Sequence, residues 1–174
     1  MGGVKIVIAG PKGASKSSIA SFLSGQADGI KLDTYNPTAG VRILEFDTQV
    51  KGFSDAIAVE LWDASGDHQY ENCWKGIMDG ADGVILIYNP DSAGQDQQLS
   101  DWFDFFVRKN GLKDEQCMVL AFRTNQPNQE RFRPPPLFSR VKAALQTNET
   151  VQEIKEMFDD FMKAVTSQNQ RSRK

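Results

Sequence analysis

The chain has 174 residues and a mass of 19.4 kDa, which fits one domain that can bury a core without disulfides or metals. Its 20 Lys and Arg against 23 Asp and Glu leave a net charge of −3, which argues against a general nucleic-acid binder. The apolar runs are too short to cross a bilayer, and the sequence shows neither a signal peptide nor a C-terminal cysteine for prenylation. We therefore expect a cytoplasmic protein without a direct membrane anchor.

In the first half of the chain, short apolar runs alternate with loops of small and polar residues. Residues 4–9, rich in Val and Ile, predict a buried strand, and a small-residue loop leads from it into a helix over residues 18–24. Residues 41–46 and 56–62 predict two strands that we expect to form the one antiparallel hairpin. A short helix is expected around residues 70–78.

The second half continues this alternation. Residues 83–88 and 118–122 predict two further buried strands, separated by a helix over residues 95–109 that carries four aromatic side chains. Residues 123–139 are polar and contain three consecutive prolines, which exclude a helix there. A weak strand is expected at residues 140–145.

A final helix follows, which Thr150 can cap together with Glu153 at capping-box spacing. Apolar residues recur on one face of this helix, at Val151, Ile154, Met157, Phe158, Phe161 and Val165. We assign residues 1–167 to one domain and residues 168–174 to a polar, basic tail. The order of the elements predicts an α/β fold with a six-stranded, mostly parallel sheet and helices on both faces.

The strongest chemical signal is the loop between the first strand and the first helix. Gly10 is separated by four residues from Ser15, which is followed by Lys16 and Ser17. This spacing is typical of a phosphate-binding loop, whose backbone N–H groups surround a phosphate at a helix N-terminus. We expect Lys16 to reach the β- and γ-phosphates and Ser17 to bind Mg²⁺. Ser15 replaces the second glycine of the pattern, and its Cβ atom is expected to strain the loop.

Two further segments support a nucleotide site. Asp63 and Gly66 follow the third strand, where Asp63 would hold Mg²⁺ through a water molecule and the Gly66 N–H would contact the γ-phosphate. Thr38, which comes just before the second strand, would coordinate Mg²⁺ and sense the γ-phosphate. Either segment alone would pass for an ordinary turn, but their positions downstream of the phosphate loop favour the functional interpretation.

Together the three segments resemble the small GTPases of the Ras superfamily, and the Rab branch in particular. Residues 41–46, 60–63 and 71–74 are similar to the Rab-like small GTPase subunit of intraflagellar transport complex B. The resemblance implies a P-loop NTPase fold of the small-GTPase type, with a reduced region between strands five and six. It also implies bound GTP or GDP with Mg²⁺ and docking onto coiled-coil subunits of that complex. The protein would act at the cilium or flagellum and its base, and would be a monomer outside the complex.

The resemblance assigns nucleotide contacts to three parts of the chain. The contacting residues are Gly10, Lys12, Gly13, Ala14, Ser15, Lys16, Ser17 and Ser18 of the phosphate loop, Pro37, Thr38, Asp63 and Gly66 around the γ-phosphate, and Arg123 and Asn125 at the base. The expected metal ligands among them are Ser17 and Thr38.

The base contact departs from the family pattern. Asn125 stands where the family uses an Asp that accepts two N–H bonds from guanine, so one of these bonds is lost. An unmet polar contact of this kind costs about 1–3 kcal/mol. Arg123 would still stack on the base. We expect a preference for guanine with reduced affinity and discrimination.

Two residues depart from an efficient GTPase. Asp67 replaces the Gln that orients the attacking water, and an anionic Asp cannot donate a hydrogen bond to the transition state, so we expect slow hydrolysis. Lys12 replaces a loop residue that is glycine in Ras; it would obstruct an arginine finger, supply a charge of its own, or simply lie on the surface. Nothing nearby in the sequence orients His68, which we expect to be a loop residue without a catalytic role.

A surface for partners that changes with the nucleotide is expected on the strands at residues 41–46 and 56–62 and on the short helix at residues 70–78. Ile43, Trp62 and Ile77 fall at the positions of the aromatic triad through which Rab proteins contact effectors, with Trp62 as the anchor. The aromatic residues of the helix at 95–109 are expected to pack in the core.

Three functions remain open from the sequence. The leading one is a GTP-binding subunit whose nucleotide orders the switch loops for a coiled-coil partner while hydrolysis is slow. An active switch that cycles between GTP and GDP would instead need a catalytic role for Lys12 or Asp67. A nucleotide-independent structural module is suggested by Ser15 and Asn125.

Overall fold

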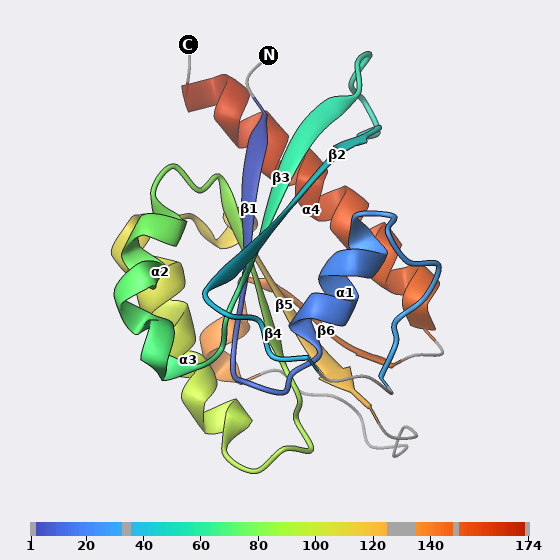
Figure 1. The fold of residues 1–174 in the computed structure, drawn as a ribbon. Coiled ribbons are helices and arrows are strands. Elements are labelled where there is room, and N and C mark those ends of the chain that lie inside the picture. Colours follow the sequence, from blue (N-terminus) through green and yellow to red (C-terminus); the bar gives the residue numbers. More distant parts are fainter. Residues whose placement is uncertain (1–2, 33–35, 125–134, 148–149, 173–174) are drawn as a thin grey trace.

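The strands and helices alternate along the chain much as the sequence predicts. The computed structural model describes residues 3–32, 36–124, 135–147 and 150–172 (Figure 1). The strands are β1 (Val4–Ala9), β2 (Val41–Thr48), β3 (Ile57–Ala64), β4 (Gly83–Tyr88), β5 (Cys117–Arg123) and β6 (Lys142–Thr147). The α-helices are α1 (Lys16–Leu23), α2 (Glu71–Met78), α3 (Gln95–Phe106) and α4 (Val151–Ser172). Short 3₁₀ turns lie at His68–Tyr70, Arg108–Asn110, Asp114–Gln116 and Pro136–Phe138.

The six strands form one sheet in the order β2-β3-β1-β4-β5-β6. Only the β2–β3 pair is antiparallel, and the other neighbouring strands run parallel. This confirms the predicted fold, including the hairpin. A mostly parallel sheet requires helical crossovers on its faces, which is why its inner strands are almost continuously apolar.

Helices cover both faces of the sheet, with α1 and α4 on one side and α2 and α3 on the other (Figure 1). Successive side chains of a strand point to opposite faces. In β1, therefore, Ile6 and Ile8 join the core under α1 and α4, whereas Val7 and Ala9 join the core under α2 and α3. The expected core role is confirmed for Trp102, Phe103 and Phe106, which are buried, whereas Phe105 is partly exposed and packs against the same core cluster.

Several element boundaries differ from the sequence prediction by one or more residues, among them those of β6, α3 and α4. Strand β6 covers Lys142–Thr147 instead of residues 140–145, since its pairing with β5 begins at Lys142 opposite Met118. Helix α3 ends at Phe106, and a 3₁₀ turn at Arg108–Asn110 follows it before Gly111 takes a left-handed conformation. Helix α4 continues to Ser172 and so includes residues 168–172.

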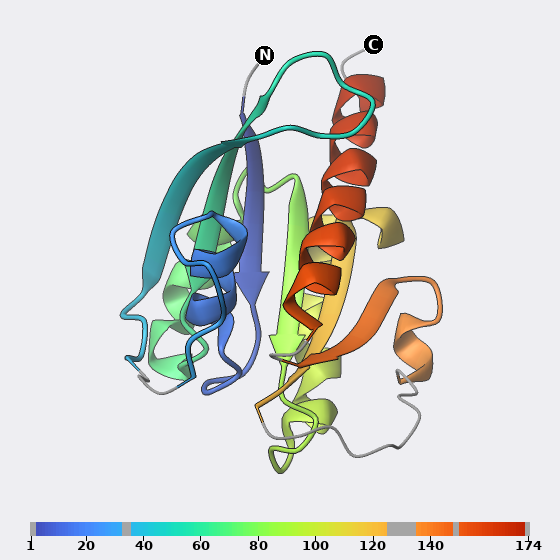
Figure 2. The same cartoon turned by 90° about the vertical axis from the view of Figure 1, so that its right-hand side faces the viewer.

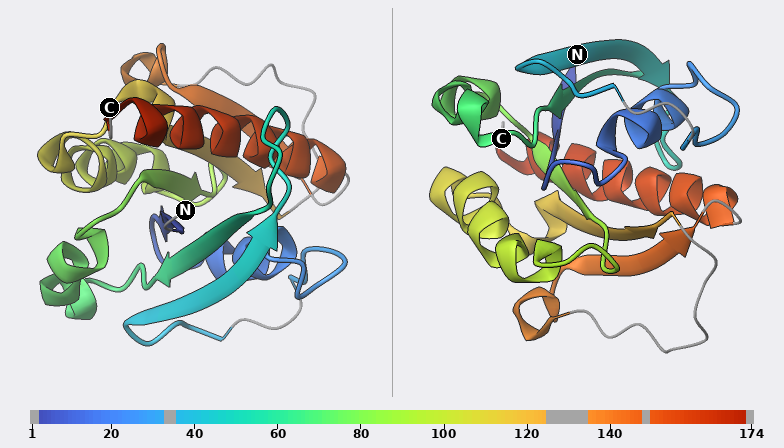
Figure 3. Two further views of the ribbon diagram at one scale, coloured as in Figure 1. Left: turned by 90° about the horizontal axis from the view of Figure 1, so that it is seen from above. Right: turned by 60° about the horizontal axis from the view of Figure 1, so that its bottom comes forward.

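Several parts of the chain converge at one edge of the sheet. The loops that follow the carboxyl ends of β1, β3 and β4 lie at this edge, which comes forward in the right-hand view of Figure 3. The opposite end of the β2–β3 hairpin lies beside α4, as the turned view shows (Figure 2). Ligands of open α/β sheets bind at the carboxyl ends of the strands, so the fold positions a site at the loops that follow β1, β3 and β4.

Candidate functional site

The loop between β1 and α1 has a backbone that only glycine adopts easily at several positions. Gly10 has a φ of 142° and Gly13 a φ of 78°. Ser15 has a φ of 62° and is the single non-glycine residue with a positive φ in the described ranges. A non-glycine residue in this region is strained by about 1–2 kcal/mol. The strain expected from the Cβ atom of Ser15 is therefore present, and the loop nevertheless keeps its curled shape.

Lys16 is buried beside this loop. Its Nζ atom donates a hydrogen bond to the main-chain oxygen of Pro11 at 2.7 Å. Burial lowers the pKa of Lys16 to about 8, although the negative charge of Asp63 opposes that shift. Burial disfavours the protonated form of this lysine, and a bound anion would stabilise that form again. The position of Lys16 therefore suits the binding of an anion.

Three side-chain oxygens from three elements meet next to the loop. Ser17 Oγ lies 2.7 Å from Thr38 Oγ1, and Thr38 Oγ1 lies 3.5 Å from Asp63 Oδ2. Asp63 is completely buried, and within the described residues its Oδ1 atom has no hydrogen-bond partner. Burial raises the pKa of Asp63, while hydrogen bonding from Ser17 and the charges of Arg42 and Lys16 lower it. Hydroxyl and carboxylate oxygens are the ligands that Mg²⁺ prefers, so these residues fit the metal expected from the sequence.

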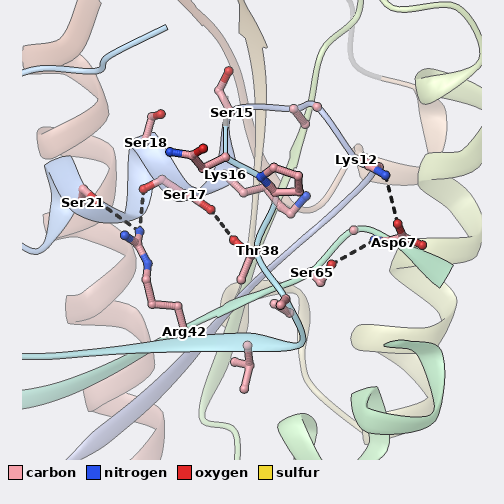
Figure 4. A pocket seen from close by; sticks show the side chains of 18 of the residues that line it. Lys12, Ser15, Lys16, Ser17, Ser18, Ser21, Thr38, Arg42, Ser65 and Asp67 are labelled. Carbon is pink, nitrogen blue, oxygen red and sulfur yellow. Dashed lines mark hydrogen bonds and ion pairs between the residues drawn. The ribbon is translucent and has the colours of Figure 1, made fainter. Parts of the chain in front are cut away.

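The loop after β3 packs directly against the phosphate loop. A Cβ atom added to Gly66 would lie 2.6 Å from the Lys12 backbone nitrogen and 2.7 Å from Lys16 Nζ, so this approach requires glycine. One residue later, Asp67 Oδ2 lies 3.0 Å from Lys12 Nζ (Figure 4). A hydrogen bond from the Gln69 backbone and the bond from Lys12 lower the pKa of Asp67. Lys12 and Asp67, the two residues that depart from the pattern of efficient GTPases, thus contact each other.

Together these segments line one open cavity of about 780 Å³. The sequence-predicted residues on its wall are Lys12, Gly13, Ala14, Ser15, Lys16, Ser17, Ser18, Pro37, Thr38, Gly66 and Asp67. Figure 4 shows the side chains of Ser17 and Thr38 pointing toward each other in the wall of this cavity. A cavity of this size holds a small-molecule ligand such as a nucleotide.

Of the two residues expected to contact the nucleotide base, the structure describes Arg123. The Nε atom of Arg123 forms an ion pair with Asp91 Oδ1 at 3.0 Å, and the Arg123 side chain is largely buried. Its stacking on a base stays a prediction. Asn125 lies outside the described residues.

Two residues that sequence reasoning missed hold the site together. Arg42 on β2 donates to the main-chain oxygen of Ser17 at 2.8 Å and pairs with Asp63. The register of the predicted hairpin would have revealed this role, because it places Arg42 directly opposite Asp63. Gln95 is buried at the start of α3, donates to the Lys12 main-chain oxygen at 3.0 Å and accepts from the Asn89 backbone at 2.7 Å. No sequence signal points to Gln95.

The expected partner surface is only partly exposed. Ile43 is 45% exposed and lies opposite Trp62 in the β2–β3 register. Trp62 is half-buried, with Lys5 Nζ 3.6 Å from its ring and its Nε1 atom donating to Glu60. Ile77, however, is only 3% exposed, because α2 turns this residue into the core toward α3. Including Ile77 in one exposed patch with the other two residues was therefore wrong.

His68 sits on an aromatic cluster away from the predicted metal ligands. Its ring lies 5.3 Å from that of Trp74 and 5.9 Å from that of Trp102, between centroids. Its Nδ1 atom lies 3.4 Å from Glu71 Oε2. These contacts agree with a packing role for this loop histidine.

The described helices include none that combines the length and apolar character needed to span a membrane.

The chain matches the family model described as Roc, the Ras of Complex domain of DAPkinase, over residues 5–125. It is 32% identical over 165 residues to a Danio rerio intraflagellar transport protein 22 homolog, with 91% of this chain and 88% of the relative covered. It is also 32% identical over 177 residues to the Mus musculus homolog, at coverages of 97% and 93%.

Among solved structures, the chain is similar to the GTP-bound crystal structure named T. brucei IFT22/74/81. The TM-score is 0.83, the sequence identity is 23%, and 99% of each chain is covered. At this identity the likeness establishes the fold.

Proposed function

Since this chain belongs to the family of intraflagellar transport protein 22 homologues and carries a Ras-type domain, we propose that it is a guanine-nucleotide-binding subunit of intraflagellar transport complex B. The observation that carries the proposal is the convergence of Ser17, Thr38 and Asp63 beside the phosphate loop. Hydroxyls from the helix start and from the loop before β2 come together in this way when that loop closes over a nucleotide and its metal.

The roles of the site residues follow from their positions. The N–H groups of the curled loop and the buried Lys16 bind the β- and γ-phosphates, and the Gly66 N–H contacts the γ-phosphate. Ser17 and Thr38 would hold Mg²⁺ directly, and Asp63 would hold it through a water molecule. When bound, Mg²⁺ would neutralise part of the phosphate charge.

Slow hydrolysis is the second part of the proposal. The carboxylate of Asp67 is ionised at neutral pH, because hydrogen bonds from Gln69 and Lys12 lower its pKa. An ionised carboxylate accepts hydrogen bonds but donates none, so it cannot stabilise charge on the γ-phosphate. The ion pair with Asp67 also directs Lys12 across the front of the loop, where an arginine from a partner would enter.

The third part concerns the partner. A related structure is named as a complex of IFT22 with components 74 and 81, and we propose that this chain likewise docks onto coiled-coil subunits at the cilium or flagellum and its base. Ile43 and Trp62 are the apolar residues of the docking face, which lies at the end of β2 nearest the nucleotide site. Closure of the loop that carries Thr38 would thus bias the conformation of this face.

The nucleotide is tested by extracting the purified protein and identifying what is released. We expect GDP or GTP in near-stoichiometric amount, and little from the Ser17→Asn variant, which loses a metal ligand. The Ser139→Asn variant, changed far from the site, should retain as much as the wild type. Absence of nucleotide from the wild type, together with failure to bind added GDP and Mg²⁺, would leave only the structural module.

Docking is tested with a purified coiled-coil pair in pull-down assays. Ile43→Asp should reduce binding at least tenfold while nucleotide retention is unchanged, because a charge replaces the exposed apolar residue. Ala58→Asp is the matched control, since Ala58 is exposed at the other end of the same hairpin. Equal binding by the two variants would contradict this docking face.

A further inference from the structure

Arg42 connects three elements of the site through one side chain. It lies on β2 opposite Asp63 of β3, and its Nε atom is 3.4 Å from Asp63 Oδ2. Its Nη2 atom donates to the main-chain oxygen of Ser17 at 2.8 Å and to Ser21 Oγ at 3.1 Å. Figure 4 shows this side chain rising from β2 to the start of α1. The guanidinium therefore contacts Ser17, a proposed metal ligand. It also contacts the carboxylate of Asp63, which lies beside Thr38, the second proposed ligand.

The charge of Arg42 matters because of where Asp63 lies. Asp63 is completely buried, and a buried carboxylate is unstable unless a cation or hydrogen bonds compensate it. The groups that compensate it among the described residues are the charges of Lys16 and Arg42 and the hydroxyls of Ser17 and Thr38. In the proposed function Lys16 turns to the phosphates when a nucleotide is bound, whereas Arg42 is held in place by Ser17 and Ser21.

We propose that Arg42 is a positioning residue that holds Ser17 and Asp63 in their binding geometry without Mg²⁺ and so reduces the dependence of nucleotide retention on that ion. The inference rests on the proposed nucleotide binding. With the metal absent, Asp63 and the phosphates repel each other, and the fixed guanidinium offsets part of this repulsion. With the metal present, the repulsion is already neutralised and Arg42 contributes less.

A residue that only braced the fold would behave differently. Its loss would lower the stability and speed nucleotide release by the same factor in both conditions. A compensating charge acts mainly in the metal-free state. The ratio of the release rate after chelation to the rate in excess Mg²⁺ therefore separates the two roles.

The experiment measures release of a fluorescent GDP analogue in excess Mg²⁺ and after addition of EDTA. In the Arg42→Met variant we expect the ratio of the two rates to rise on the order of tenfold above the wild-type ratio, a size typical of contacts to charged groups. Arg42→Lys, which keeps the charge without the fork, should give an intermediate ratio. Arg108→Met is the control, because Arg108, in the 3₁₀ turn after α3, forms an exposed ion pair with Asp104.

Each outcome bears on a different claim. Equal ratios for the wild type and Arg42→Met would overturn the inference and leave nucleotide binding intact. A ratio in Arg42→Lys as high as in Arg42→Met would overturn the assignment to charge. If Arg42→Met does not fold, Arg42→Lys against the wild type decides alone, since loss of the fork must still raise the ratio. A wild type that binds no GDP would overturn the proposed function, and this inference with it.

Discussion

Lys12 and Asp67 meet in front of the phosphate loop, with 3.0 Å between Lys12 Nζ and Asp67 Oδ2. Both side chains are partly exposed, so this pair adds little to stability. Its significance is positional, because an ion pair of a cation and an anion occupies the approach to the proposed γ-phosphate position. Of the three roles open for Lys12 from the sequence, the contact favours the one in which it obstructs a partner's arginine.

The Asp67→Gln variant should hydrolyse GTP faster than the wild type. Gln can accept a hydrogen bond from the attacking water and donate another to the phosphate, and it no longer holds Lys12 by charge. We expect the single-turnover rate to rise about tenfold, or about 1.4 kcal/mol in the barrier. Asp67→Asn, which removes the charge without the reach, is the control and should change little. A sharp fall in Asp67→Ala would instead identify Asp67 as catalytic.

Lys16 predicts a pH dependence of nucleotide binding. Its pKa is about 8 in the ligand-free protein, below the ordinary value of 10.5, and a bound phosphate must raise it. Affinity should therefore be constant below pH 8 and fall by up to tenfold per pH unit above it, with one proton taken up on binding. The stability of the ligand-free protein should rise over the same pH range, because the unfolded chain binds the additional proton.

Calorimetry of GDP binding at pH 7 and pH 9, in buffers with different ionisation enthalpies, measures that proton. Lys16→Arg is the control, because arginine stays charged and takes up no proton. Equal proton uptake at both pH values would show that Lys16 is already charged in the free site.

The elements meet closely enough that single glycines decide their packing. Gly83 begins β4, and a Cβ atom there would lie 2.9 Å from Phe161 Cζ and 3.0 Å from Val165 Cγ2 of α4. The strand therefore approaches the last helix more closely than any other residue type allows. Phe161 and Val165 belong to the apolar stripe of α4, so this contact joins that stripe to the sheet.

Gly83→Ala should destabilise the protein by about 1–3 kcal/mol through overpacking. Gly76→Ala is the matched control: Gly76 lies within α2, has nothing within 4 Å of an added Cβ, and should stabilise the helix by about 0.8–1 kcal/mol. Urea unfolding measures both changes. A Gly83→Ala variant as stable as the wild type would mean that α4 can move away from β4 at no cost.

Across the whole molecule, the site joins segments that would otherwise be independent. The cavity is bounded by the loops after β1 and β3 and by the segment before β2, which belong to different parts of the chain. A ligand that bridges them favours the folded state over the unfolded one. Nucleotide binding should therefore appear as global stabilisation.

GDP with Mg²⁺ at about a hundred times its dissociation constant should stabilise the protein by about 2.7 kcal/mol. For a chain of this length that corresponds to a rise of roughly 5–11 °C in Tm. GMP is the control, since it lacks the β-phosphate that the loop is expected to surround, and it should shift Tm by much less. An equal shift with GMP would place the binding energy outside the phosphate loop.

Local patterns in the sequence determined the elements and much of the site. The runs of Val and Ile that form β1 and β4 have the predicted bounds, because continuous apolar stretches between loops become buried strands. The order of the phosphate loop, Thr38 and Asp63 likewise placed the site, since each segment follows or precedes a strand at the same sheet edge. The resemblance to small GTPases then identified the family.

Only the tertiary structure decided which side chains contact each other across these segments. Lys12 meets Asp67 over 55 residues of sequence, and Arg42 reaches Ser17 over 25. Ile77 is buried although its position in the family pattern suggested exposure. Such contacts depend on strand register and on the rotation of each helix, which shift whole sets of side chains between faces without changing the local pattern. The sequence therefore determined which chemistry is available, and packing decided which residues perform it.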